Sequence, residues 1–152
     1  MIASFGRRYT ISASHRLHTD ALSADENRAT YGKCNNPHGH GHNYVVEVLI
    51  TGAVDAETGM VVDMAALDDV VRSHVVDRFD HANLNLDPLF VNRVPTTENL
   101  TKAIFELLDG SIVDGSIVDG SIQDRSIEPA KLVRVRVEET ENNFFEYSGE
   151  SS

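Results

Sequence analysis

Residues 34–51 read CNNPHGHGHNYVVEVLIT, a stretch that passes from a polar, histidine-rich loop into a β-rich segment. The β-branched and aromatic residues from His42 to Thr51 predict a strand. Upstream, residues 4–14 alternate polar and apolar side chains, which predicts a half-buried strand. If these two strands pair as neighbours, the histidines lie at one end of the pair.

Two helices are predicted in the middle of the chain. Asp63 is suited to cap the first, which runs to about Arg78. The hydroxyl of Thr96 or of Thr97 can cap the second, and Gly110 is expected to end it. Apolar residues recur at helical spacing in both segments, so each helix has one face to bury.

The remaining segments complete one domain. Residues 18–38 are polar and predict a long loop, while residues 131–138 and 144–147 predict two further strands joined by a turn. The order β-β-α-α-β-β predicts an α+β fold, with one domain over residues 1–152.

A pentapeptide repeat interrupts this pattern. Residues 109–128 read DGSIVDGSIVDGSIQDRSIE. Isoleucines every five residues match neither a helical nor a strand period, so the segment has no consistent face to bury. We interpret it as an inserted surface loop that is dispensable for folding, because extra loop length adds little closure entropy.

Composition excludes several classes of protein. The formal net charge of -11 makes a nucleic acid an unfavourable partner. The sequence has no apolar run of about 18–20 residues and no secretory signal, which predicts a soluble, cytoplasmic protein without a membrane partner. Local positive charge is still available, because Arg7, Arg16 and Lys33 lie near the histidine-rich segments.

The histidines predict a metal site. In an extended segment His40 and His42 lie on one face, and His15 at the end of the first strand can supply a third ligand. Three neutral imidazoles with one open position are typical of catalytic Zn²⁺. His38 either replaces one of these ligands or lies at the rim of the pocket.

Further candidates follow from context. Cys34 is the single cysteine, so it forms no internal disulfide and is a free thiol, a metal ligand or a nucleophile. Lys33 and a nearby metal would lower the pKa of its thiol. Asp80 and His81 form either an ordinary charge pair at a helix end or a cooperating pair in a loop.

Six segments together resemble the 6-pyruvoyl-tetrahydropterin synthase family along nearly the whole chain outside the repeat. They are SASHRL (12–17), GKCNNPHGHGHNY (32–44), TGMVVDM (58–64), DHANLNLD (80–87), PTTENL (95–100) and VEETENN (137–143). The resemblance implies a tunnelling fold, in which a four-stranded antiparallel sheet carries two helices on one face. It also implies a homohexamer with active sites between subunits.

The resemblance further assigns roles to residues. His15, His40 and His42 would bind Zn²⁺, and Cys34 would be the catalytic base, with Asp80 and His81 as a proton relay. The pterin ring would be anchored by Glu139, beside Thr96 and Thr97. The substrate implied is the small molecule 7,8-dihydroneopterin triphosphate, which loses triphosphate in a lyase reaction that gives 6-pyruvoyl-tetrahydropterin.

The resemblance leaves two products open. Relatives in the queuosine (deazapurine) pathway act on the same substrate as 6-carboxytetrahydropterin synthases, and they resemble the pattern Cys-x-x-x-His-Gly-His. Five residues separate Cys34 from His40, as in pyruvoyl-forming members, but His38-Gly39-His40 satisfies the shorter pattern. Asn43 and Tyr44 after the histidines favour ligands at 40 and 42, and hence the pyruvoyl product.

Overall fold

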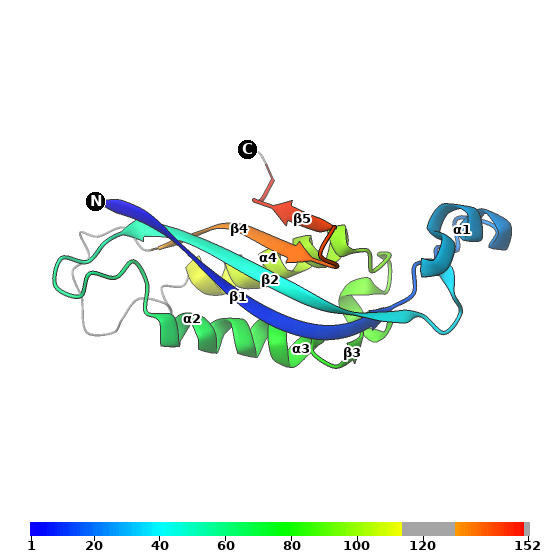
Figure 1. Ribbon diagram of the computed structural model, residues 1–152, viewed down its shortest axis with the longest axis horizontal. Helices are drawn as coiled ribbons and strands as arrows, with labels where there is room; N and C mark the ends of the chain where they lie inside the picture. Colours follow the sequence, from blue (N-terminus) through cyan, green and yellow to red (C-terminus); the bar gives the residue numbers. More distant parts are fainter. Residues whose placement is uncertain (114–129, 151–152) are drawn as a thin grey trace.

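A long antiparallel hairpin of β1 (Ile2–His15) and β2 (His40–Ala53) crosses the molecule (Figure 1). The computed structural model describes residues 1–113 and 130–150. β4 (Lys131–Glu138) pairs with β2, and β5 (Phe144–Tyr147) pairs with β4, both in the antiparallel direction. The predicted bounds of these two C-terminal strands are confirmed.

The prediction of a four-stranded antiparallel sheet was wrong. β3 (Ala82–Asn83) pairs with β1 in the parallel direction, so the described residues form a five-stranded mixed sheet in the order β3-β1-β2-β4-β5. The His81 N–H donates to the Ser12 carbonyl over 2.6 Å, and the Ser12 N–H donates to the Asp80 carboxylate over 2.8 Å. These contacts attach the short strand to the edge of β1.

Helices cover one face of the sheet (Figure 1). The side chains that alternate inward along the hairpin meet apolar stripes from α2 (Met64–Val71) and α4 (Thr97–Val113). Burial of this apolar surface is the main favourable contribution to folding. The fully buried members include Ile11, Tyr44, Val46, Val48, Ile50, Leu67, Val71, Leu100, Ile104 and Leu108.

The first predicted helix begins as expected. The Asp63 carboxylate accepts the N–H groups of Ala65 and Ala66, which caps α2. The helical path continues through a π-helical turn, η2 (Arg72–Val76), and ends with α3 (Asp77–Phe79). Two 3₁₀ turns, η3 (Leu84–Leu86) and η4 (Pro88–Phe90), then lead from β3 towards α4.

The predicted end of the second helix was wrong. α4 passes through Gly110 to Val113, and the first isoleucine of the repeat, Ile112, is only 3% exposed. The start of the repeat therefore belongs to the core, because Ile112 continues the apolar stripe of α4. The remainder of the predicted inserted loop, from residue 114 onward, lies outside the described residues.

The polar segment 18–38 is not simply a loop. It contains α1 (Ala24–Tyr31) and a 3₁₀ turn, η1 (Gly32–Asn35), at one end of the hairpin (Figure 1). The Ser23 hydroxyl accepts the Glu26 N–H, an arrangement that caps helix N-termini. Asn27 is fully buried, and its side-chain amide donates hydrogen bonds to neighbouring backbone carbonyls. These hydrogen bonds hold the segment together where an apolar core is lacking.

Membrane-spanning helices are absent from the described part of the chain, since none of its helices is both long and apolar enough.

Replacing Ile112 with alanine should lower the free energy of unfolding by about 2–4 kcal/mol, because a buried side chain is removed from the core. Urea denaturation measures the change. Ile2→Ala is the matched control, since Ile2 is 79% exposed and its loss should cost less than about 0.5 kcal/mol. Equal denaturation midpoints for the two variants would contradict the packing of Ile112.

Candidate metal centre

Three histidines converge at the end of the β1–β2 hairpin. The strand register pairs His15 with His40 and Ala13 with His42, which brings all three rings to one face. The Nε2 atoms of His15 and His40 are 3.2 Å apart, and one ring nitrogen from each histidine lies within 4.8 Å of the others. The three side chains could therefore hold one metal ion.

The His15 ring is held in place by a hydrogen bond on the side away from the other histidines. Its side chain is 1% exposed, and its Nδ1 lies 2.8 Å from the Pro95 carbonyl oxygen. Because a carbonyl only accepts, Nδ1 carries the proton and donates it, and the lone pair of Nε2 points towards the other histidines. The Tyr44 hydroxyl is 3.4 Å from the same Nδ1.

The electrostatics favour neutral rings. Burial lowers the pKa of His15, and the neighbouring His40 and His42 lower it further. Burial also lowers the pKa of His42. Neutral imidazole is the form that coordinates metal, so the site is prepared for a cation.

One buried histidine nitrogen makes no hydrogen bond to a described residue. His42 Nε2 is inaccessible to solvent and makes no hydrogen bond within the described residues. A buried polar atom without a partner is costly, and a bound cation would satisfy it. The histidine donor set and this atom together fit a metal ion.

Glu139 lies next to the three histidines, at the end of the strand that neighbours β2 in the sheet. It directly follows β4, and its Oε1 lies 3.4 Å from His42 Nε2 and 3.7 Å from His15 Nε2. Its backbone N–H donates to the Asn143 carbonyl, which holds the turn before β5. A carboxylate thus borders the metal centre.

Gly39 sets the entry into β2. Its φ is 69°, in the left-handed region, and a Cβ there would lie 2.8 Å from the His15 carbonyl oxygen. Glycine is required for both reasons. His38, just before it, is exposed and lies outside the histidine cluster of the described residues.

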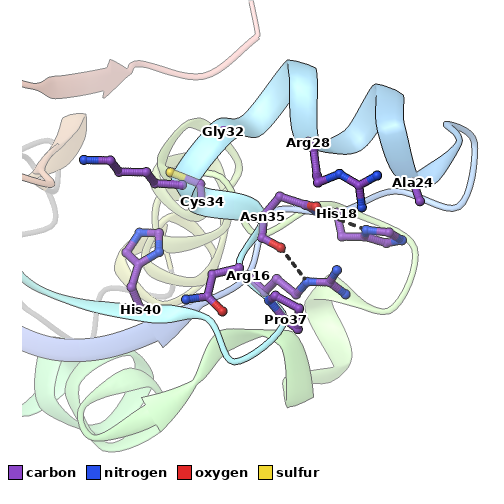
Figure 2. Close-up of a pocket in the computed structure, with 11 residues that line it drawn as sticks. Arg16, His18, Ala24, Arg28, Gly32, Cys34, Asn35, Pro37 and His40 are labelled. Carbon is purple, nitrogen blue, oxygen red and sulfur yellow. Dashed lines mark hydrogen bonds between the residues drawn. The ribbon is translucent and has the colours of Figure 1, made fainter.

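A cavity of about 680 Å³ adjoins the centre at His40 (Figure 2). Cys34 lines it, and burial raises the pKa of the Cys34 thiol, with the Glu139 charge raising it further. The lowered pKa expected from the sequence assumed a nearby metal ion, whereas this direction applies to the chain without one. The expectation counted Lys33 and a metal, but neither the burial of the thiol, which contributes most to the raised pKa, nor the Glu139 carboxylate that the fold brings close.

Asp80 and His81 lie elsewhere. His81 borders a separate hollow together with Ser12 and Asn43. The Ser12 hydroxyl donates to the Asn43 side chain, and these two residues are paired across β1 and β2, next to the pair Ala13 and His42. The His81 side chain is 84% exposed, and its Nε2 is 3.5 Å from the Asp80 carboxylate. Within one chain, His81 and Cys34 thus line different hollows.

The two threonines have different surroundings. The Thr96 hydroxyl accepts the Asn99 N–H and caps α4, whereas Thr97 is 3% exposed. The Thr97 hydroxyl makes no hydrogen bond to a described residue. It still lies close enough to the Tyr44 hydroxyl to lower the pKa of that group, although burial dominates and the net pKa of Tyr44 is raised.

Sequence reasoning missed several residues around the site. The Pro95 carbonyl, which orients His15, leaves no sequence signal because any residue has a carbonyl. Arg28 lines the cavity and was missed because α1 was predicted as loop, although the pattern Ser-x-x-Glu at residues 23–26 indicates a helix start. Arg7 lies away from the site, in an ion pair with Asp68.

Fold and site together define an α+β protein in which three histidines that could hold a metal ion lie beside a cavity lined by a cysteine. The model of the family "6-pyruvoyl tetrahydropterin synthase" matches residues 5–150. The chain belongs to this family.

Relatives and solved structures agree with this assignment. The 6-pyruvoyl tetrahydrobiopterin synthase of Homo sapiens is 40% identical over 97% of this chain and 92% of its own length. The Dictyostelium discoideum protein of the same name is 42% identical over 95% and 94%. The structure of Caenorhabditis elegans 6-pyruvoyl tetrahydropterin synthase superposes with a TM-score of 0.83 at 40% identity, covering 99% of this chain and 97% of that one.

His42→Ala should abolish binding of the metal ion, because it removes one of the three imidazoles that converge within the described residues. His38→Ala should leave the metal content near that of the parent chain. Elemental analysis of the purified variants measures both, and His15→Ala and His40→Ala should behave as His42→Ala does. Metal loss in His38→Ala with retention in His42→Ala would show that the ligand register is wrong.

Proposed function

We propose that the chain is a zinc-dependent 6-pyruvoyl tetrahydropterin synthase, which converts 7,8-dihydroneopterin triphosphate into 6-pyruvoyl-tetrahydropterin and triphosphate. The observation that carries the proposal is the convergence of His15, His40 and His42 beside the cavity that contains Cys34. The supporting context is about 40% identity to synthases of this name over nearly the full chain.

Zinc is the metal that suits the donor set. Three neutral imidazoles favour Zn²⁺ among the common metals, whereas Mg²⁺ and Ca²⁺ prefer oxygen ligands. Bound there, Zn²⁺ would supply Lewis acidity that makes the hydroxyls of the substrate side chain more acidic. The chain's own contribution is a set of preorganised ligands, with His15 held in one tautomer by Pro95.

Glu139 and Thr97 are the proposed pterin contacts. The aminopyrimidinone edge of a pterin offers adjacent N–H donors, and a carboxylate can accept two of them. The side chain of Glu139 is 15% exposed and no described lysine or arginine pairs with it, while the Asn143 amide donates to its Oε2 only over a long 3.5 Å. Thr97 brings a buried hydroxyl that makes no hydrogen bond of normal geometry within the described residues, while the Thr96 hydroxyl is already used in capping α4.

Cys34 is the proposed base that moves protons on the side-chain carbons of the substrate. A thiolate is required, and burial together with Glu139 opposes its formation in the metal-free chain. A cation at the histidines would favour the thiolate, because it offsets the negative charge of Glu139 beside Cys34. The base would therefore be activated when the metal is in place.

Asp80 and His81 are proposed to act at a site shared with another copy of the chain. Their exposed position, away from Cys34, suits a contact made by a neighbouring subunit. The His81 backbone has φ of 58° and is held by the bond to Ser12, so the exposed ring projects from a defined turn. A homohexamer with active sites between subunits, located in the cytoplasm, is the assembly that we propose.

The pyruvoyl product is favoured over the carboxy product. The shorter cysteine–histidine spacing would need His38 as a ligand, and His38 lies outside the cluster of described histidines. Incubation with 7,8-dihydroneopterin triphosphate and mass spectrometry of the pterin decides between them. Recovery of 6-carboxytetrahydropterin alone would replace the proposed activity with that of the queuosine pathway.

Cys34→Ala should retain the fold and bound zinc while turnover falls by about 10²–10⁴-fold, the usual contribution of a general base. Circular dichroism, zinc analysis and product formation are the three measurements. A variant that keeps parental turnover would remove Cys34 from the mechanism.

Adding Zn²⁺ to the metal-free chain should accelerate alkylation of Cys34 by iodoacetamide at neutral pH, because positive charge stabilises the thiolate. Glu139→Gln should accelerate it in the metal-free chain too, since this removes the charge that raises the pKa of the thiol. Mass spectrometry follows the modification. Rates that are insensitive to both changes would contradict the electrostatic coupling of Cys34 to the site.

A further inference from the structure

The cavity beside the metal centre has a charge opposite to that of the whole chain. The chain carries 24 acidic and 13 basic residues, yet the cavity lining contains Arg16, Arg28 and Lys33 and no aspartate or glutamate. Figure 2 shows Arg16 and Arg28 around this space together with Cys34 and His40. Positive side chains gathered in a hollow of an acidic protein attract anions locally.

Arg16 is held in place by the fold. Its backbone N–H donates to the Asn85 side chain over 2.7 Å, and the Asn85 amide donates back to its carbonyl over 2.9 Å. The Nε of its guanidinium donates to the Asn35 carbonyl over 3.2 Å (Figure 2). The terminal nitrogens make no hydrogen bond to a described residue, so they are available to a ligand.

The other two cations differ in availability. Lys33 forms no ion pair within the described part of the chain, whereas Arg28 is ion-paired with Asp25 on the surface of α1. Arg16 and Lys33 therefore have unmatched charge, and Arg28 is partly neutralised at the rim. An anion that enters the cavity would meet Arg16 and Lys33 as its principal partners.

We propose that this cavity is a polyphosphate site that holds the triphosphate of the substrate through Arg16 and Lys33. The assignment of the anion as the triphosphate of the substrate rests on the proposed function. The presence of an anion site rests on the cavity and its lining residues alone. A volume of about 680 Å³ is in the range of small-molecule sites and leaves room for a linear triphosphate. Because Cys34 and His40 line the same space, the phosphates would lie next to the reacting side chain.

Calorimetric titration of the full chain with inorganic triphosphate tests the site, with metal content measured before and after because triphosphate chelates Zn²⁺. Arg16→Gln and Lys33→Gln should each weaken binding by about tenfold, as expected for loss of a charge-assisted hydrogen bond. Arg16→Lys should recover part of the loss. Arg93→Gln is the matched control, since Arg93 is an exposed arginine outside the cavity, and it should bind triphosphate as the parent does.

A second titration uses 7,8-dihydroneopterin, which lacks the phosphates and should bind all these variants equally. Parental triphosphate affinity in both Arg16→Gln and Lys33→Gln, or an equal loss in Arg93→Gln, would overturn the proposal. Failure of the proposed function is distinguishable, because it would appear as no turnover of 7,8-dihydroneopterin triphosphate by the parent chain. The inorganic triphosphate titration decides the anion site in either case.

Discussion

The register of the β1–β2 hairpin is the constraint on which the rest of the structure depends. Pairing of His15 with His40 places three imidazoles on one face, and the same alternation buries Ile11 and Tyr44 against the helices. A shift by one residue would turn the apolar side chains towards solvent and separate the histidines. The core and the metal centre are therefore specified by one pairing, and the cost of exposing the core protects the geometry of the site.

Patterns local in sequence predicted much of this arrangement. Alternation indicated the strands, Asp63 and Thr96 indicated the helix starts, and closely spaced histidines indicated the metal centre. β3 was not predictable, because two residues have no period, and its place depends on bonds from Asp80 and His81 to a distant strand. α1 was missed since its residues are polar and its buried side chain is an asparagine.

The chemistry of Cys34 shows where sequence reasoning ends. Neighbours along the chain predicted a lowered thiol pKa, yet in the metal-free chain burial raises the pKa of the Cys34 thiol, and the charge of Glu139, far away in sequence, raises it further. In the same way, the residue spacing does not show that, within one chain, His81 borders a different hollow from the one that Cys34 lines. Charges and pair partners at the site depend on tertiary placement, which residue spacing does not contain.

The excursion between β1 and β2 begins after His15 and returns at His40, two residues that face each other across the hairpin. An ion held by both would act as a removable cross-link at the neck of this closed loop, much as a disulfide restricts the chain between two cysteines. Arg16, Lys33 and Cys34 all lie on the loop that this cross-link would close. A bound metal ion would thus restrict the conformational freedom of the segment between His15 and His40, which forms the cavity wall. The availability of the metal would then influence how rigid this segment is.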